Sequence, residues 1–117
     1  MSKVWVKGHA RAKDGDTARF EKWAAELVEK IRSSDPNTLA FGVYPTGSND
    51  EYVFLELYAD SAAAMGHFAN VGPLLGQMGE VADPTGAPLE VYGNISDELR
   101  DAYAAWGPVI VAPVSDC

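Results

Sequence analysis

Two residues of one predicted strand carry side chains that can move a proton, Glu56 and Tyr58. They stand two positions apart, so in a strand they share a face. A buried carboxyl at Glu56 would have its pKa raised by desolvation and could serve as a base, with the Tyr58 phenol as a donor beside it. The alternative is that Glu56 forms an ion pair in the sheet, for example with Lys7 or Arg11.

A third candidate, His67, follows on a predicted helix among Met65, Phe68 and Val71. An imidazole on an apolar helix face can be a general base, a heme or metal ligand, or a hydrogen-bonded core residue. Strand end and helix start are close in the chain, so Tyr58 and His67 can share a pocket if both point inward.

His9 is the fourth candidate and lies in phase with Trp5 and Lys7 on the first predicted strand. The alternative for His9 is an exposed strand residue. His9, His67 and Glu56 together could ligate a metal, but the chain contains no close-spaced ligand pair such as His-x-His. We therefore expect no metal site and no bound cofactor.

The elements that position these residues follow from periodicity. Alternation predicts strands, 3/4 apolar spacing predicts amphipathic helices, and the turn-forming residues 47–50 predict a hairpin. The strands are expected at 3–12, 38–46, 51–59 and 87–95, and the helices at 17–33 and 62–69, with a further helical turn from Gly72-Pro73. This β-α-β-β-α-β order is the α+β, ferredoxin-like arrangement, an antiparallel sheet with helices on one face.

Aromatic residues supply candidate walls for a pocket between the sheet and the two helices. We expect Glu56, Tyr58 and His67 to line it together with such neighbours. The candidates for substrate contact are Trp5, Trp23, Tyr44, Phe54 and Phe68. Trp23 also fits the apolar stripe of the first helix, where it would be a core residue.

Both faces of the predicted sheet are largely apolar. On the third strand Val53, Leu55 and Leu57 oppose Tyr52 and Phe54, and the helices suffice to cover only one face. An uncovered apolar face favours a partner sheet, so we expect a homodimer packed face to face.

The C-terminal segment is an addition to this fold. We divide the chain into a domain at 1–95 and a tail at 96–117, which begins with a helix capped by Ser96 and continues as an extended apolar stretch from Val109. Leu99, Tyr103 and Trp106 are expected to dock that helix. So apolar a tail should pack on its own subunit or on the partner.

Composition excludes several classes of function. The chain has 117 residues and a formal net charge of −8, which disfavours nucleic acid and anionic membranes as partners. No apolar run approaches a membrane span, and the single cysteine, Cys117, excludes an intramolecular disulfide. We expect a cytoplasmic protein. Phosphate-binding glycine loops and nucleophile-elbow motifs are absent from the sequence.

Residues 54–60, Phe-Leu-Glu-Leu-Tyr-Ala-Asp, run into Ala63-Ala64-Met65-Gly66-His67-Phe68. This stretch resembles the strand and the histidine-bearing helix of the antibiotic biosynthesis monooxygenase (ABM) family, in the dimeric α+β barrel superfamily. The Asp14-Gly15 turn and the strand ending Leu89-Glu90-Val91-Tyr92 are also similar, and the resemblance covers about residues 3–95.

The resemblance implies a cofactor-independent monooxygenase that acts on a small aromatic phenol or quinol. It implies that His67 points into the ligand cavity and that His9 orients substrate or oxygen. Some family oxygenases carry a tryptophan where this chain has Tyr58. The alternatives are a non-catalytic small-molecule-binding or structural dimer, and a heme-binding or heme-degrading protein. Heme degradation would need an asparagine-like partner, where this chain has Lys7 or His9.

Overall fold

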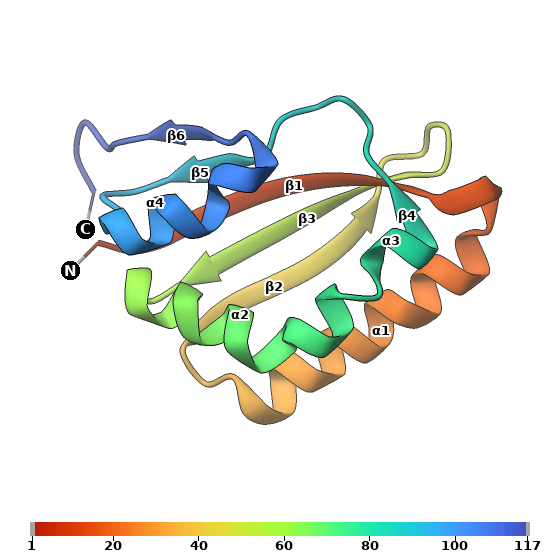
Figure 1. Ribbon diagram of the computed structural model, residues 1–117, viewed down its shortest axis with the longest axis horizontal. Coiled ribbons are helices and arrows are strands. Elements are labelled where there is room, and N and C mark those ends of the chain that lie inside the picture. The colour runs from red at the N-terminus through yellow and green to blue at the C-terminus, as the bar shows by residue number, and fades with distance from the viewer. Residues whose placement is uncertain (1, 117) are drawn as a thin grey trace.

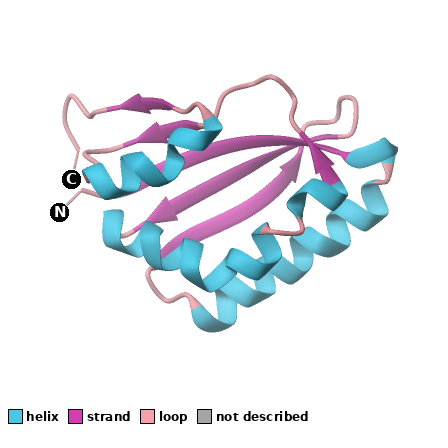
Figure 2. Ribbon diagram, in the orientation of Figure 1, coloured by secondary structure: helices cyan, strands magenta, loops and turns pink. Residues whose placement is uncertain are grey.

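A computed structural model describes residues 2–116, so Cys117 lies outside the described range. Across these residues a single open sheet carries helices on one face (Figures 1 and 2). The strands are β1 (Val4–Ala12), β2 (Thr38–Pro45), β3 (Glu51–Tyr58), β4 (Ala82–Asp83), β5 (Glu90–Tyr92) and β6 (Val109–Val111). The helices are α1 (Thr17–Ser34), α2 (Ser61–Leu75), α3 (Met78–Val81) and α4 (Asp97–Tyr103), with 3-10 turns at Lys13–Gly15 and Ala104–Trp106.

The strand order is β2-β3-β1-β5-β6, with β4 paired to β1. All pairings are antiparallel except that of β5 with β6. The α+β, ferredoxin-like prediction is confirmed. The extended tail adds the β6 strand to the predicted sheet by pairing with β5 of the same chain.

Alternation along the strands separates the two faces of the sheet. On β1, Val4 and Val6 are buried beneath the helices, whereas Trp5 between them is 55% exposed. Because Val4 pairs with Tyr58 and Val6 with Glu56, Glu56 and Tyr58 of β3 face the helices. His9 is in phase with Trp5 and lies on the open face.

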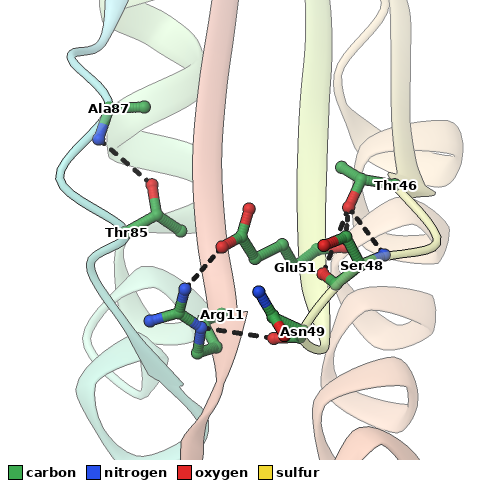
Figure 3. A network of polar contacts seen from close by, with 7 residues as sticks. All are labelled: Arg11, Thr46, Ser48, Asn49, Glu51, Thr85 and Ala87. Carbon is green, nitrogen blue, oxygen red and sulfur yellow. Dashed lines mark hydrogen bonds and ion pairs between the residues drawn. The ribbon is translucent and has the colours of Figure 1, made fainter.

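The β2–β3 hairpin is fastened to β1 at its turn (Figure 3). Asn49 and Asp50 adopt positive φ angles of 52° and 57°, a conformation that asparagine and aspartate tolerate better than most residues. Arg11 Nε donates to the Asn49 carbonyl at 3.2 Å, and the Arg11 guanidinium also pairs with Glu51. Arg11 therefore pairs with Glu51 rather than with Glu56.

Two apolar clusters fill the space between sheet and helices. The first is centred on α1 and packs Phe20, Trp23 and Leu27 against Phe54 of β3. The second packs Tyr58 and the α2 alanines against α4. Glu56 stands between Phe54 and Tyr58 on β3, so a carboxyl lies at the junction of the two clusters.

The second helix differs from prediction. Instead of ending near residue 69 and restarting at Gly72-Pro73, α2 continues through Pro73 to Leu75. Trp23 of α1 donates from Nε1 to the Leu74 carbonyl at 2.9 Å. That bond and the fully buried Val71 fix the last turn, so packing outweighs the helix-breaking tendency of proline.

The tail helix α4 docks mainly through two residues. Leu99 is fully buried and Tyr103 is 2% exposed, whereas Trp106 is 50% exposed. The apolar spacing of the helix puts Trp106 on the same buried stripe as Leu99 and Tyr103, and for Trp106 this prediction is wrong. The 3-10 turn after α4 leaves half of its side chain exposed, although the ring still meets Phe68 edge to face at 5.8 Å and Tyr103 at a tilted angle at 6.1 Å. The ends of the described chain meet, since Ser2 Oγ donates to Asp116 at 2.9 Å.

Of the helices in residues 2–116, none is both long and apolar enough to cross a bilayer.

Candidate functional site

The centre of the candidate site is the pair of side chains Glu56 and Tyr58. Tyr58 is fully buried, and its hydroxyl donates to the Glu56 carboxylate. Burial raises the pKa of Glu56 to about 7, and the hydrogen bond from Tyr58 opposes some of that rise. No ion pair joins Glu56 to a lysine or arginine within residues 2–116, so near neutral pH this carboxyl can hold or release a proton.

The charge of Glu56 acts on the pKa of two buried phenols, Tyr58 and Tyr103. Burial and the charge of Glu56 raise the pKa of Tyr58 well above its ordinary value. The same two causes raise the pKa of Tyr103, which α4 brings to the site from the tail. Both phenols therefore remain protonated hydrogen-bond donors. From the sequence Tyr103 is only a packing residue, because nothing in its spacing points to Glu56.

His67 is the third polar group of the site. It is 3% exposed, and its Nδ1 lies 2.9 Å from Oδ2 of Asp35, itself 9% exposed. Burial lowers the pKa of His67, with Asp35 acting in the opposite direction. The imidazole is therefore neutral at pH 7 and can accept a proton. The sequence assigns Asp35 only to the end of a helix, since its 32-residue separation from His67 carries no signal.

Aromatic rings join these groups into one wall. The His67 ring centroid is 5.0 Å from that of Tyr58, 5.6 Å from Phe41 and 6.0 Å from Phe68. Phe68 in turn contacts Tyr103 edge to face at 5.2 Å. Four elements, β2, β3, α2 and α4, thus contribute to one apolar surrounding for the acid and the imidazole (Figure 1).

Other residues predicted for the site lie elsewhere. Trp23 and Phe54 pack in the first cluster with Phe20, 3% and 7% exposed. His9, Trp5 and Tyr44 lie on the opposite face of the sheet, where the His9 imidazole is 3.8 Å from Glu90. The sheet therefore separates His9 from the imidazole of His67.

Two surface hollows are also present. The first, of about 530 Å³, lies between α1 and β2 and is bordered by Glu21, Val43 and Tyr52. The other, of about 780 Å³, lies near both chain ends, beside Asp60 and Arg100. Neither is lined by Glu56, Tyr58 or His67. Among residues 2–116, no three histidine, cysteine or carboxylate side chains cluster as metal ligands would.

One polar atom near the site lacks a hydrogen-bond partner. Thr38 stands opposite Tyr58 in the β2–β3 pairing. Its hydroxyl oxygen is buried and has no partner among the described residues. A buried hydroxyl left unpaired costs free energy, so Thr38 is available to hydrogen-bond a ligand or water next to Tyr58.

The family profile for antibiotic biosynthesis monooxygenases matches residues 4–72. The chain belongs to this family. The matched segment holds Asp35, Glu56, Tyr58 and His67, whereas Tyr103 lies beyond it. No curated protein has a matching sequence.

Solved structures share the fold of this ABM chain. MupZ from Pseudomonas fluorescens superposes with a TM-score of 0.83 at 21% identity, over 98% of this chain and 92% of MupZ. An antibiotic biosynthesis monooxygenase candidate from Caulobacter crescentus CB15 gives 0.68 at 23% identity, over 77% and 87%. A conserved protein from Methanosarcina mazei Go1 gives 0.67 at 17% identity, over 79% and 92%. Because the superposition with MupZ covers 98% of this chain, it includes the C-terminal tail from Ser96.

Proposed function

We propose that this ABM protein is a monooxygenase that acts on a small aromatic phenol or quinol without a metal or bound cofactor. The observation that carries the proposal is the array of a buried neutral imidazole, a buried protonated phenol and a partly buried acid with a pKa of about 7, with aromatic rings packed around the imidazole. Such an array can take a proton from a phenol and stabilise the anion that results.

The chemistry needs no external reductant. His67 takes the proton of the substrate phenol, and the electron-rich ring carbon of the phenolate bonds to oxygen. The O–O bond and the C–H bond of that carbon then break, so that one oxygen atom stays on the carbon as a quinone carbonyl. The other oxygen takes the ring proton and the proton held by His67 and leaves as water. The substrate supplies all the electrons. Tyr103 and protonated Glu56 can donate hydrogen bonds to the oxygen that carries the charge, while the Tyr58 hydroxyl holds Glu56 in place.

The second candidate is a small-molecule-binding or structural dimer without turnover. It is favoured by the tight packing at His67, which is 3% exposed, and by the location of both surface hollows away from that residue. A third candidate, heme binding, would require the His67 imidazole to leave its contact with Asp35 or to bind iron through Nε2.

The homodimer belongs to the proposal as well. Exposed large apolar side chains on the open face of the sheet extend from β2 to β6: Tyr44, Leu55, Trp5, Tyr92, Val109 and Val111. A patch of this kind marks an interaction site, and a second copy presents a matching apolar sheet. The single cysteine suits a reducing cytoplasm, where we place the protein.

The test is oxygen consumption with a panel of phenols and quinols. We expect turnover by the wild type and a loss of about 10²–10⁴-fold in His67→Ala. His67→Gln keeps a polar side chain of similar size in case alanine prevents folding. Exposed Glu26→Gln on α1 is the control and should retain wild-type turnover. Normal rates in both folded His67 variants would favour the binding protein, and a Soret shift with hemin would favour the third candidate.

A further inference from the structure

Asp35 is held rigidly in the connection between α1 and β2. Its backbone N–H donates to Ile31 at 3.0 Å, and its carbonyl accepts from Thr38 at 3.1 Å. Pro36 follows and restricts the backbone of Asp35 itself. The carboxylate therefore reaches the His67 ring from a fixed position, although it belongs to a different element.

The chemistry of the two groups decides which nitrogen holds the proton. A carboxylate only accepts hydrogen bonds, so the 2.9 Å contact requires a proton on Nδ1 of His67. A neutral imidazole carries one proton, and Nε2 is then left with its lone pair. Aromatic groups surround the ring: Tyr58 from β3, Phe41 from β2 and Phe68 from α2.

We propose that Asp35 is the positioning residue that fixes His67 in the Nδ1-protonated tautomer and so makes Nε2 the proton acceptor of the site. The catalytic consequence rests on the proposed monooxygenase function, whereas the tautomer itself does not. A simple structural tie between the α1–β2 connection and α2 would explain the contact without any demand on Nε2.

Nitrogen NMR of the imidazoles tests the tautomer without a substrate. The chain has two histidines, so a His9→Gln background leaves only the His67 signals. In that background we expect the Nδ1-protonated form at pH 7–8. With Asp35→Ala added, the signals should move towards the Nε2-protonated form. An Nε2-protonated ring before Asp35 is changed, or an unchanged tautomer in folded Asp35→Ala, would overturn the proposal.

Turnover gives the second readout. Asp35→Asn keeps the size of the side chain, and we expect kcat to fall about tenfold or more while KM changes little, since outer partners of a functional histidine have effects of this order. Because the Asp35 charge raises the pKa of His67, its loss should also move the acidic limb of the kcat profile to lower pH. Exposed Asp101→Asn on α4 is the matched control.

These outcomes separate the two proposals. If no phenol or quinol is oxidised but the NMR result holds, the monooxygenase function fails and the role of Asp35 in setting the tautomer stands. If turnover depends on His67 but Asp35→Asn leaves kcat and its pH profile unchanged, Asp35 is only a structural tie.

Discussion

Glu56 holds its proton more tightly in the folded protein than in the unfolded chain. Desolvation raises its pKa from 4.5 to about 7, because the partly buried carboxyl lies between two apolar clusters without a cation. A raised pKa means that Glu56 contributes stability below about pH 4.5 and that this contribution is lost as the pH rises through about 7. The same group can act as an acid in the neutral range.

Glu56→Gln should remove that pH dependence, because glutamine does not titrate. Its amide oxygen can still accept the hydrogen bond from the Tyr58 hydroxyl. Between pH 5 and pH 8 the wild type should lose roughly 2 kcal/mol of unfolding free energy relative to the variant. Urea unfolding at equal protein concentration measures the difference. Glu26→Gln, on the exposed face of α1, should follow the wild type at both pH values. Parallel pH curves for wild type and Glu56→Gln would contradict the shift.

At the scale of elements, α4 does more than extend the fold. It covers the end of the second cluster with Leu99 and brings Tyr103 into that cluster with Tyr58. The Ser96 hydroxyl caps the helix by accepting from Leu99 N at 3.1 Å, and β6 then pairs with β5. The tail therefore belongs to the surroundings of the candidate site.

Leu99→Ala should lower the unfolding free energy by about 2–5 kcal/mol, because it opens a cavity at a fully buried position. We also expect turnover to fall if α4 shifts, since Tyr103 lies on the same helix. Val114→Ala, at an exposed position of the tail, should change the unfolding free energy by less than about 0.5 kcal/mol. Denaturant melts provide the measurement, and equal stability of the two variants would mean that the tail does not support the core.

For the whole molecule, the unequal faces of the sheet matter most. Helices cover one face, and the other exposes Trp5, Tyr44 and Leu55 by about half. A charged group also lies on this open face, where Glu90 contacts His9 and accepts from Tyr92. Burying such a face against a second copy would remove a large apolar area from water.

Light scattering should therefore report twice the 12.5 kDa chain mass at micromolar concentration. Leu55→Lys should give a monomer, since the new ammonium would lie beside its pairing partner Lys7 on the apolar face. Ala25→Lys adds the same charge to the exposed side of α1 and should leave the dimer intact. A wild-type mass of one chain would rule out association through this face.

Local patterns in the sequence were enough for most of the fold. The apolar spacing predicted the first helix at 17–33, and α1 is Thr17–Ser34. Alternation predicted that Glu56 and Tyr58 share a face, because successive side chains of a strand point to opposite faces of the sheet. The sequence also predicted that both faces of the sheet are apolar, because this depends only on which residues alternate along each strand.

Only the tertiary structure decided which groups meet. The sequence gives no reason to pair Asp35 with His67 or Tyr103 with Phe68, because long-range contacts depend on how helices pack rather than on local spacing. It also left His9 and His67 as possible partners, and the register of β1 with β3 placed His9 on the other face from Glu56. The alternation of side chains along a strand determines which residues share a face, but packing decides which face of the sheet the helices cover.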